Sequence, residues 1–260
     1  MPLVLIALPG SGFDPTEASV PWRVLRQQGH QIIVATPDGR EARADPRLLT
    51  GQGLGIVSPF LKADRNARAA YEEMVGSREY REPIAYPDID PERIDGLILP
   101  GGHAPGVRPY LESARLQGVV GRLFEKNRPV GAICHGVLIP ARARRSDGRS
   151  VLYGRKVTAL PRLMELTGWL LTYPYLGNYL RTYPVPVEDE IRAALAARAD
   201  FLRGPPMMFH DSPQRLQVGF TVRDGNFLSA RWPGDAHRFA HDFAALMEGA
   251  SKVGAKCSRD

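Results

Sequence analysis

The residues Ala132-Ile133-Cys134-His135-Gly136 lie where an apolar run, 129–133, gives way to a helical pattern. A side chain at such a junction stands at the carboxyl edge of a sheet, as does the serine of a hydrolase nucleophile elbow. The N-terminus of a helix also favours the thiolate form of a cysteine. We therefore expect Cys134 to be a reactive nucleophile, with His135 contributing either its ring or only its backbone amide.

The segments around this junction predict an α/β fold with a mainly parallel sheet. Short apolar runs alternate with amphipathic helical patterns, which is typical of parallel strands joined by crossover helices. Strands are expected at 3–8, 31–36, 94–99, 129–133, 155–160, 217–222 and 227–230, the last two joined by a hairpin at Asp224-Gly225. Helices are expected after Asp14, near 66–75, over 111–124, near 187–199 and around 239–247.

The length of 260 residues and a hydrophobic fraction of 43% allow one sizeable core. We expect a single domain over 1–250, with insertions at about 37–91 and 164–208 and a flexible tail over 251–260. Insertions at the carboxyl edge of a parallel sheet commonly form walls or a lid over a ligand.

Charge and cysteine content exclude several classes of protein. The formal net charge is +6, but the arginines are scattered apart from a cluster over 142–156, and no aromatic residues are interleaved with it, so we expect no nucleic-acid partner. The two cysteines, Cys134 and Cys257, are too few for a disulfide framework, which indicates a reducing cytoplasm. The apolar run at 3–8 is too short to span a bilayer and lacks the basic flank of a signal peptide, so no membrane association is expected.

A second motif, Leu99-Pro100-Gly101-Gly102-His103, follows the strand expected at 94–99. Paired glycines let the backbone approach a ligand and turn its amides inward, as the stabilisation of an oxyanion requires. We expect Gly101 and Gly102 to lie beside Cys134 as a substrate-binding turn, although such a pair often forms only a tight turn. His103 either lines the site or caps the next segment.

The stretch Asp14-Pro15-Thr16-Glu17 allows two interpretations. Asp14 as N-cap, Pro15 at the first helical position and Glu17 at the third resemble a capping box. Alternatively, the Glu17 carboxylate faces Cys134 across the strand ends. One carboxylate cannot fill both roles equally well.

These motifs together resemble the ThiJ/PfpI family of the class I glutamine amidotransferase-like superfamily. The resemblance spans residues 1 to about 248 and rests on D-P-T-E with Pro21-Trp22, P-G-G-H at 100–103, A-I-C-H-G at 132–136 and S-A-R-W-P-G-D at 229–235. It implies a flavodoxin-like three-layer sandwich, usually a homodimer. It further implies that Cys134 is the nucleophile, that Glu17 lies beside its sulfur, and that the backbone at Gly102 and His135 forms the oxyanion site.

The size and the insertions resemble the branch that contains stress chaperones and glutathione-independent glyoxalase III enzymes. In that branch an acidic residue follows a Gly-Lys-x-Ile-Thr segment, and Gly154-Arg155-Lys156-Val157-Thr158 with Glu165 matches its spacing. The resemblance thus implies Glu165 as a partner for His135, the alternative being a surface helix glutamate. Trp232-Pro233-Gly234-Asp235 stands where an amidotransferase needs His-Pro-Glu, which argues against ammonia transfer from glutamine.

Three functions remain open from the sequence. The first is a glyoxalase III-type enzyme that converts a small α-oxoaldehyde such as methylglyoxal to lactate through Cys134, without a metal or an organic cofactor. The second is a cysteine peptidase or amidase acting on amide substrates, in which Glu165 aligns His135 as the general base. The third is a non-enzymatic redox sensor or holding chaperone with an oxidisable thiol.

Overall fold

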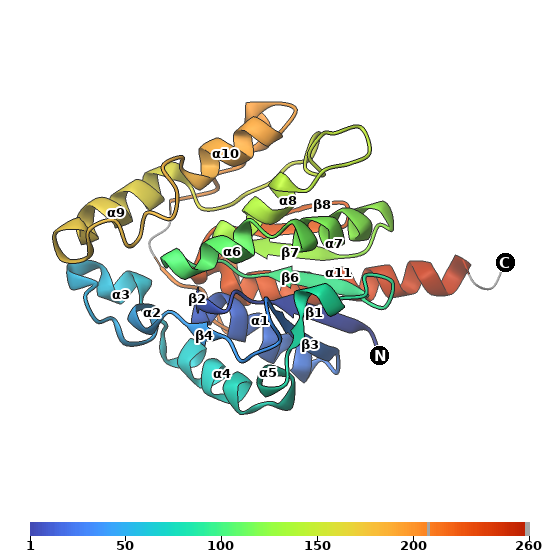
Figure 1. Cartoon of the computed structure of the whole chain (residues 1–260), viewed down its shortest axis with the longest axis horizontal. Coiled ribbons are helices and arrows are strands. Elements are labelled where there is room, and N and C mark those ends of the chain that lie inside the picture. The colour runs from blue at the N-terminus through green and yellow to red at the C-terminus, as the bar shows by residue number, and fades with distance from the viewer. Residues whose placement is uncertain (207–208, 258–260) are drawn as a thin grey trace.

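The computed structural model describes residues 1–206 and 209–257 (Figure 1). Within them, the central sheet has seven strands in the order β5-β3-β1-β6-β7-β9-β8. In that order their bounds are Ile84–Ala85, Gln31–Thr36, Leu3–Ala7, Gly96–Leu99, Val130–Ile133, Phe227–Ala230 and Thr221–Asp224. Neighbouring strands are parallel except for the β8–β9 hairpin. The mainly parallel α/β fold predicted from the sequence is therefore confirmed.

The topology of the sheet indicates where a ligand binds. Apart from the two-residue β5, which is also parallel, the parallel strands β3-β1-β6-β7-β9, numbered along the chain, lie in the order 2-1-3-4-5, which is the flavodoxin-like order. The order reverses between β1 and β6, where Ile6 pairs with Val34 on one side and Ile98 on the other. Ligands bind outside the carboxyl ends of the strands at such a switch point.

Helices cover both faces of the sheet (Figure 1). Helix α1 packs against α4 and α11, whereas α7 packs against α8, which in turn contacts α10. Gly131 in β7 makes room for α11, because a Cβ there would lie 2.7 Å from the Phe243 ring and 2.9 Å from the Phe239 ring. The α-helices are α1 (Pro15–Gln27), α2 (Pro46–Thr50), α3 (Ser58–Leu61), α4 (Arg65–Gly76), α5 (Arg78–Arg81), α6 (Arg108–Leu111), α7 (Ala114–Glu125), α8 (Leu138–Arg142), α9 (Arg162–Leu176), α10 (Val187–Ala194) and α11 (Ala236–Cys257).

The two insertions pack against each other beyond the carboxyl edge of the sheet. Helix α9 contacts the 3₁₀ turn Gly55–Val57, and a separate apolar cluster joins Leu48, Leu54 and Val57 of the first insertion to Leu180 of the second. Figure 1 shows α9 beside α3 at one end of the molecule. A further pair of short parallel strands, β2 (Ser11–Phe13) and β4 (Arg43–Ala44), ties the first insertion to the segment before α1.

Several expected elements differ from the structure. Residues 155–160 form no strand and contribute only a single bridge, Val157 to Phe201, because β9 is already paired with β7 and β8 on its two sides. The strand expected at 217–222 begins later, at Thr221, after a 3₁₀ turn at Leu216–Val218. Helix α11 continues to Cys257, into the expected tail, of which 258–260 lie outside the described residues. No helix in the described part of the chain is long and apolar enough to span a membrane.

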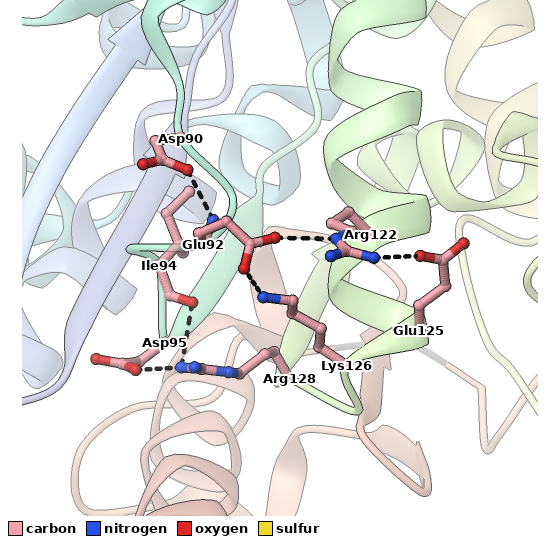
Figure 2. A network of polar contacts seen from close by, with 8 residues as sticks. All are labelled: Asp90, Glu92, Ile94, Asp95, Arg122, Glu125, Lys126 and Arg128. Atoms are coloured by element: carbon pink, nitrogen blue, oxygen red, sulfur yellow. Dashed lines mark hydrogen bonds and ion pairs between the residues drawn. The ribbon is translucent and has the colours of Figure 1, made fainter.

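The amino edge of the sheet carries a network of ion pairs (Figure 2). Glu92 accepts from Arg122 at 2.9 Å and also pairs with Lys126, while Arg128 pairs with Asp95. These side chains are partly exposed, so each pair contributes only about 0–1 kcal/mol to stability. A cavity of about 800 Å³ lies at this edge, opposite to the carboxyl ends of β6 and β7. The network holds the end of α7 against the segment before β6.

Candidate active site

Cys134 follows β7 directly and adopts a strained backbone conformation. Its φ of +57° is in the left-handed region, which costs a non-glycine residue about 1–2 kcal/mol. Gly136 allows this turn to pack against the end of β6, because a Cβ there would lie 2.1 Å from the Leu99 carbonyl oxygen and 2.7 Å from that of Pro100. The turn is a 3₁₀ helix, Cys134–Val137, followed by the short α8 containing Pro140. This is the geometry of a nucleophile elbow.

Asp14 and Glu17 divide the two roles that the sequence left open. The Asp14 carboxylate caps α1, accepting from the Thr16 N–H at 2.8 Å and the Glu17 N–H at 3.1 Å. Glu17 is fully buried, and its Oε2 accepts from the Gly101 N–H at 2.7 Å instead of returning to the cap. Its side chain also hydrogen bonds with that of Cys134, and Oε1 has no partner. The structure therefore places Glu17 against the cysteine.

The glycine pair contributes differently from what the sequence predicts. A Cβ at Gly101 would lie 2.8 Å from the His135 nitrogen and 2.9 Å from Glu17 Oε2, so only glycine fits between them. Because Glu17 engages the Gly101 N–H, that amide is not available to an oxyanion, which corrects the expectation. The Gly102 N–H donates to no group among the residues that the structure describes, and the His135 N–H interacts with the Cys134 sulfur. Gly102 is therefore the available oxyanion donor.

The two histidines lie on the other side of the sulfur. The His135 Nδ1 is 3.5 Å from Cys134 Sγ, and its Nε2 is buried without a partner. The His103 ring meets the His135 ring edge-on, with centroids 4.7 Å apart. Its Nδ1 is likewise unpartnered, while the ring hydrogen bonds with the backbone of Leu180. Burial lowers the pKa of both rings, that of His103 to about 4, so both are neutral near pH 7.

Burial also governs the ionisation of Cys134 and Glu17. It raises the pKa of the Cys134 thiol, and the nearby carboxyls of Glu17 and Asp14 raise it further, while the His135 N–H lowers it. The expectation of a thiol acidified by the helix N-terminus is thus wrong. Desolvation raises the pKa of the thiol by more than the backbone amides of the short turn after Cys134 lower it. Burial and repulsion from Asp14 likewise raise the pKa of Glu17. Two negative charges in this dry site repel each other, so the thiol and the carboxyl hold at least one proton between them.

Two neighbouring cavities lie beside this cluster. The inner one, about 30 Å³, is close to the volume of one water molecule and is lined by His103, Glu165 and Trp232 among others. The outer one, about 520 Å³, is lined mainly by apolar side chains, including Phe60 and Leu163. The two share Leu61, Met164, Gly168 and Trp232. Cys134 itself is 1% exposed, so a substrate must displace the walls of the inner cavity to reach the sulfur.

Comparison with known proteins assigns the chain to a family. The family described as ThiJ/PfpI family-like matches residues 8–193. The chain belongs to this family. A ThiJ/PfpI-like relative named as a deglycase, from Thermococcus kodakarensis, is 24% identical over 94% of this chain and 98% of its own length. A glutathione-independent glyoxalase from Schizosaccharomyces pombe is 27% identical over 60% of this chain and 62% of its own. The structure of glyoxalase III from Candida albicans shares the fold, with a TM-score of 0.67 and 21% identity over 94% of this chain and 97% of that one.

Within this ThiJ/PfpI-like site, Glu165 does not partner His135. Glu165 is 4% exposed on α9, and its Oε2 accepts from the Val187 N–H at 2.8 Å, at the start of α10. Among the described residues, His135 Nε2 has no hydrogen-bond partner, so Glu165 does not complete a Cys-His-Glu triad. Burial raises the pKa of Glu165 to about 7. The residue matched by spacing is therefore buried at the cavity wall and joins the two helices of the second insertion.

Sequence reasoning missed Trp232 as part of the ThiJ/PfpI-like site. Its indole is 2% exposed and lines both cavities, and Nε1 has no hydrogen-bond partner. The buried ion pair of Arg231 with Asp235, at 2.8 Å, fixes the turn that holds it. Nothing in the local sequence at 229–235 indicates that the Trp232 ring reaches a cavity.

Three side chains of the site are suited to hold a metal ion. His103, Cys134 and His135 each offer one ligand atom, and these atoms lie within 4.8 Å of one another. Imidazole nitrogens and a thiolate are ligands that Zn²⁺ prefers.

Proposed function

We propose that this chain is a cysteine-dependent, glutathione-independent glyoxalase that converts small α-oxoaldehydes, such as methylglyoxal, to 2-hydroxy acids. The observation that carries the proposal is the buried Cys134 sulfur at a strained elbow, with the Glu17 carboxyl beside it and one unpartnered carboxyl oxygen. Family membership and the relatives named as a glyoxalase and a deglycase support it.

The first step is addition of the thiol to the aldehyde. The Cys134 sulfur forms a bond to the aldehyde carbon, and the carbonyl π electrons move to its oxygen, toward the Gly102 N–H. His135 Nδ1, 3.5 Å from the sulfur, accepts the thiol proton and returns it to the new oxygen. The product is a neutral hemithioacetal. An oxyanion donor of this kind contributes about 3 kcal/mol in other acyl-transfer enzymes.

The second step moves a proton between adjacent carbons. Glu17, in its carboxylate form, accepts the proton of the hemithioacetal carbon through Oε1, and the electrons of that C–H bond move to the neighbouring carbonyl, whose oxygen takes up a proton to give an enediol. Glu17 then returns its proton to the neighbouring carbon, and the hydroxyl of the sulfur-bearing carbon releases its own proton, which replaces the one taken up, so that this oxygen becomes the thioester carbonyl. The raised pKa of Glu17 makes its carboxylate a stronger base than an ordinary glutamate. The result is a 2-hydroxyacyl thioester on Cys134. Water then hydrolyses this thioester, releasing the hydroxy acid and regenerating the thiol, with no external oxidant or reductant.

The cavities favour substrates with a small reacting end. The inner cavity, of about 30 Å³, must widen for any substrate, and a two-carbon dicarbonyl group needs far less displacement of its walls than a peptide. The apolar outer cavity favours an uncharged substituent on that group. Together with the absence of the His135–Glu165 hydrogen bond, these dimensions disfavour a cysteine peptidase.

Methylglyoxal consumption and lactate release by the purified protein test the proposal. We expect Cys134→Ala to abolish turnover and Glu17→Gln to lower kcat by about 100-fold or more, because it removes the base. Cys257→Ser is the matched cysteine control and should keep full activity. Loss of methylglyoxal no faster than with Cys134→Ala would overturn the proposal.

Deglycation is the second candidate function, because the relative aligned over 94% of this chain is named as a deglycase. The same sulfur would attack the carbinol carbon of the adduct itself, forming a C–S bond as the C–N bond breaks, and the amine would leave with the thiol proton. Turnover of a preformed adduct faster than its spontaneous release of free dicarbonyl would favour deglycation. Turnover limited by that release would indicate a glyoxalase alone.

A further inference from the structure

His103 has no role in the proposed reaction, yet its ring points into the site. Its Nδ1 is buried without a hydrogen-bond partner, as is Nε2 of His135. His103, Cys134 and His135 each offer one ligand atom, and these atoms lie within 4.8 Å of one another. Buried polar atoms are rarely left unpaired, so a cluster of them indicates a missing partner.

The geometry of the cluster is close to that of a zinc site. Tetrahedral zinc with Zn–S near 2.3 Å and Zn–N near 2.0–2.1 Å separates a sulfur and a nitrogen ligand by about 3.5 Å. Cys134 Sγ and His135 Nδ1 are 3.5 Å apart. All ligand atoms of the cluster lie within 4.8 Å of one another, so an inward shift of the His103 side chain by about 1 Å brings the set to the spacing of a zinc site.

The surroundings prepare the His103 ring to be a ligand. The hydrogen bond of the His103 ring to the Leu180 backbone leaves Nδ1 as the free nitrogen and fixes the ring orientation, as second-shell contacts of metal-bound histidines do.

The charge of the site also favours a divalent cation. Cys134 and Glu17 are both buried, and a thiolate and a carboxylate side by side in a dry pocket need a compensating positive charge. A divalent cation balances both charges. Its binding would release the thiol proton to solvent and form a metal–sulfur bond.

We propose that His103, Cys134 and His135 form a binding site for Zn²⁺, and that the bound ion reversibly blocks the thiol. The set of one thiolate and two imidazoles suits Zn²⁺ and excludes the oxygen-preferring Mg²⁺ and Ca²⁺. Three protein ligands leave a fourth position for water. Because the metal and the substrate need the same sulfur, they exclude each other.

Cobalt(II) is the probe for this site, because a thiolate–cobalt bond gives a charge-transfer band in the near ultraviolet. Titration of the full chain with Co²⁺ should give one equivalent bound with this band, and Zn²⁺ should displace it. Cys257→Ser should behave as wild type. Cys134→Ser should lose the band, and His103→Gln should weaken binding at least tenfold, with thermal unfolding confirming that each variant folds.

Three outcomes overturn the site: no thiolate band in the wild type, a band that persists in Cys134→Ser, or unchanged affinity in His103→Gln. The titration needs no substrate, so it succeeds or fails independently of the proposed glyoxalase activity. Where turnover is present, Zn²⁺ should abolish it and a chelator should restore it. Full turnover at saturating Zn²⁺ would refute the blocking role.

Discussion

Replacing Gly136 by alanine tests whether the elbow depends on close contact with the end of β6. The added methyl group would lie 2.1 Å from the Leu99 carbonyl oxygen and 2.7 Å from that of Pro100. Overpacking typically costs about 1–3 kcal/mol, and backbone oxygens cannot rotate away, so we expect a loss of about 3 kcal/mol in unfolding free energy. At about 2–4 °C per kcal/mol for a chain of this size, the melting temperature should fall by about 6–12 °C.

Circular dichroism during thermal unfolding measures this shift. Gly118→Ala is the matched control, because Gly118 lies in α7 and a Cβ there would meet nothing within 4 Å. That substitution should leave stability unchanged or raise it by up to about 1 kcal/mol through helix propensity. The Gly136 variant should also lose dicarbonyl turnover, because the sulfur moves with the turn. A melting temperature within about 2 °C of wild type would refute the reasoning.

Three further predictions concern the buried charges. The rate of Cys134 alkylation by iodoacetamide should rise with pH up to an inflection above 9.0, the ordinary pKa of a cysteine thiol. Glu17→Gln should lower the pH of that inflection. An inflection below 9.0 in the wild type would contradict the assigned pKa direction. The folded pKa of Glu165, about 7, exceeds its ordinary 4.5, so its stability contribution is full below 4.5 and is lost as pH rises to 7. In urea unfolding, the free energy of unfolding of Glu165→Gln should therefore rise by up to about 3 kcal/mol relative to that of the wild type between pH 4.5 and 8. A difference between the two proteins that stays constant over this pH range would exclude this titration. Arg231→Met should cost about 3–5 kcal/mol in the same assay because it leaves the Asp235 carboxylate buried and unpaired, and a cost below about 1 kcal/mol would contradict the buried ion pair.

The positions of four strands and the elbow were predictable because each depends on local sequence. Apolar runs bounded by glycine and proline locate β1, β3, β6 and β7 to within two residues at either end. The Asp14 cap could also be predicted, because its carboxylate bonds to amides only two and three residues away.

What the sequence could not show depends on contacts between distant segments. Residues 155–160 do not form a strand of the sheet, because β8 already pairs with the side of β9 that β7 leaves free. The Glu165 carboxylate accepts from the Val187 N–H, 22 residues away along the chain, and not from His135, which is the partner that the family resemblance implies. The pKa of Cys134 depends on burial by the whole fold, whereas the sequence showed only the short turn. The homodimer stays a prediction.

Trapping the covalent intermediate tests the central claim most directly, namely that Cys134 forms a bond to the substrate during turnover. Protein mixed with methylglyoxal is quenched in acid at short times, and the adducts are located by peptide mass spectrometry. The account predicts a mass gain of one substrate molecule on Cys134, which decays as lactate is released and is absent in Cys134→Ala. Turnover accompanied by adducts only on Cys257, lysines or arginines would contradict it.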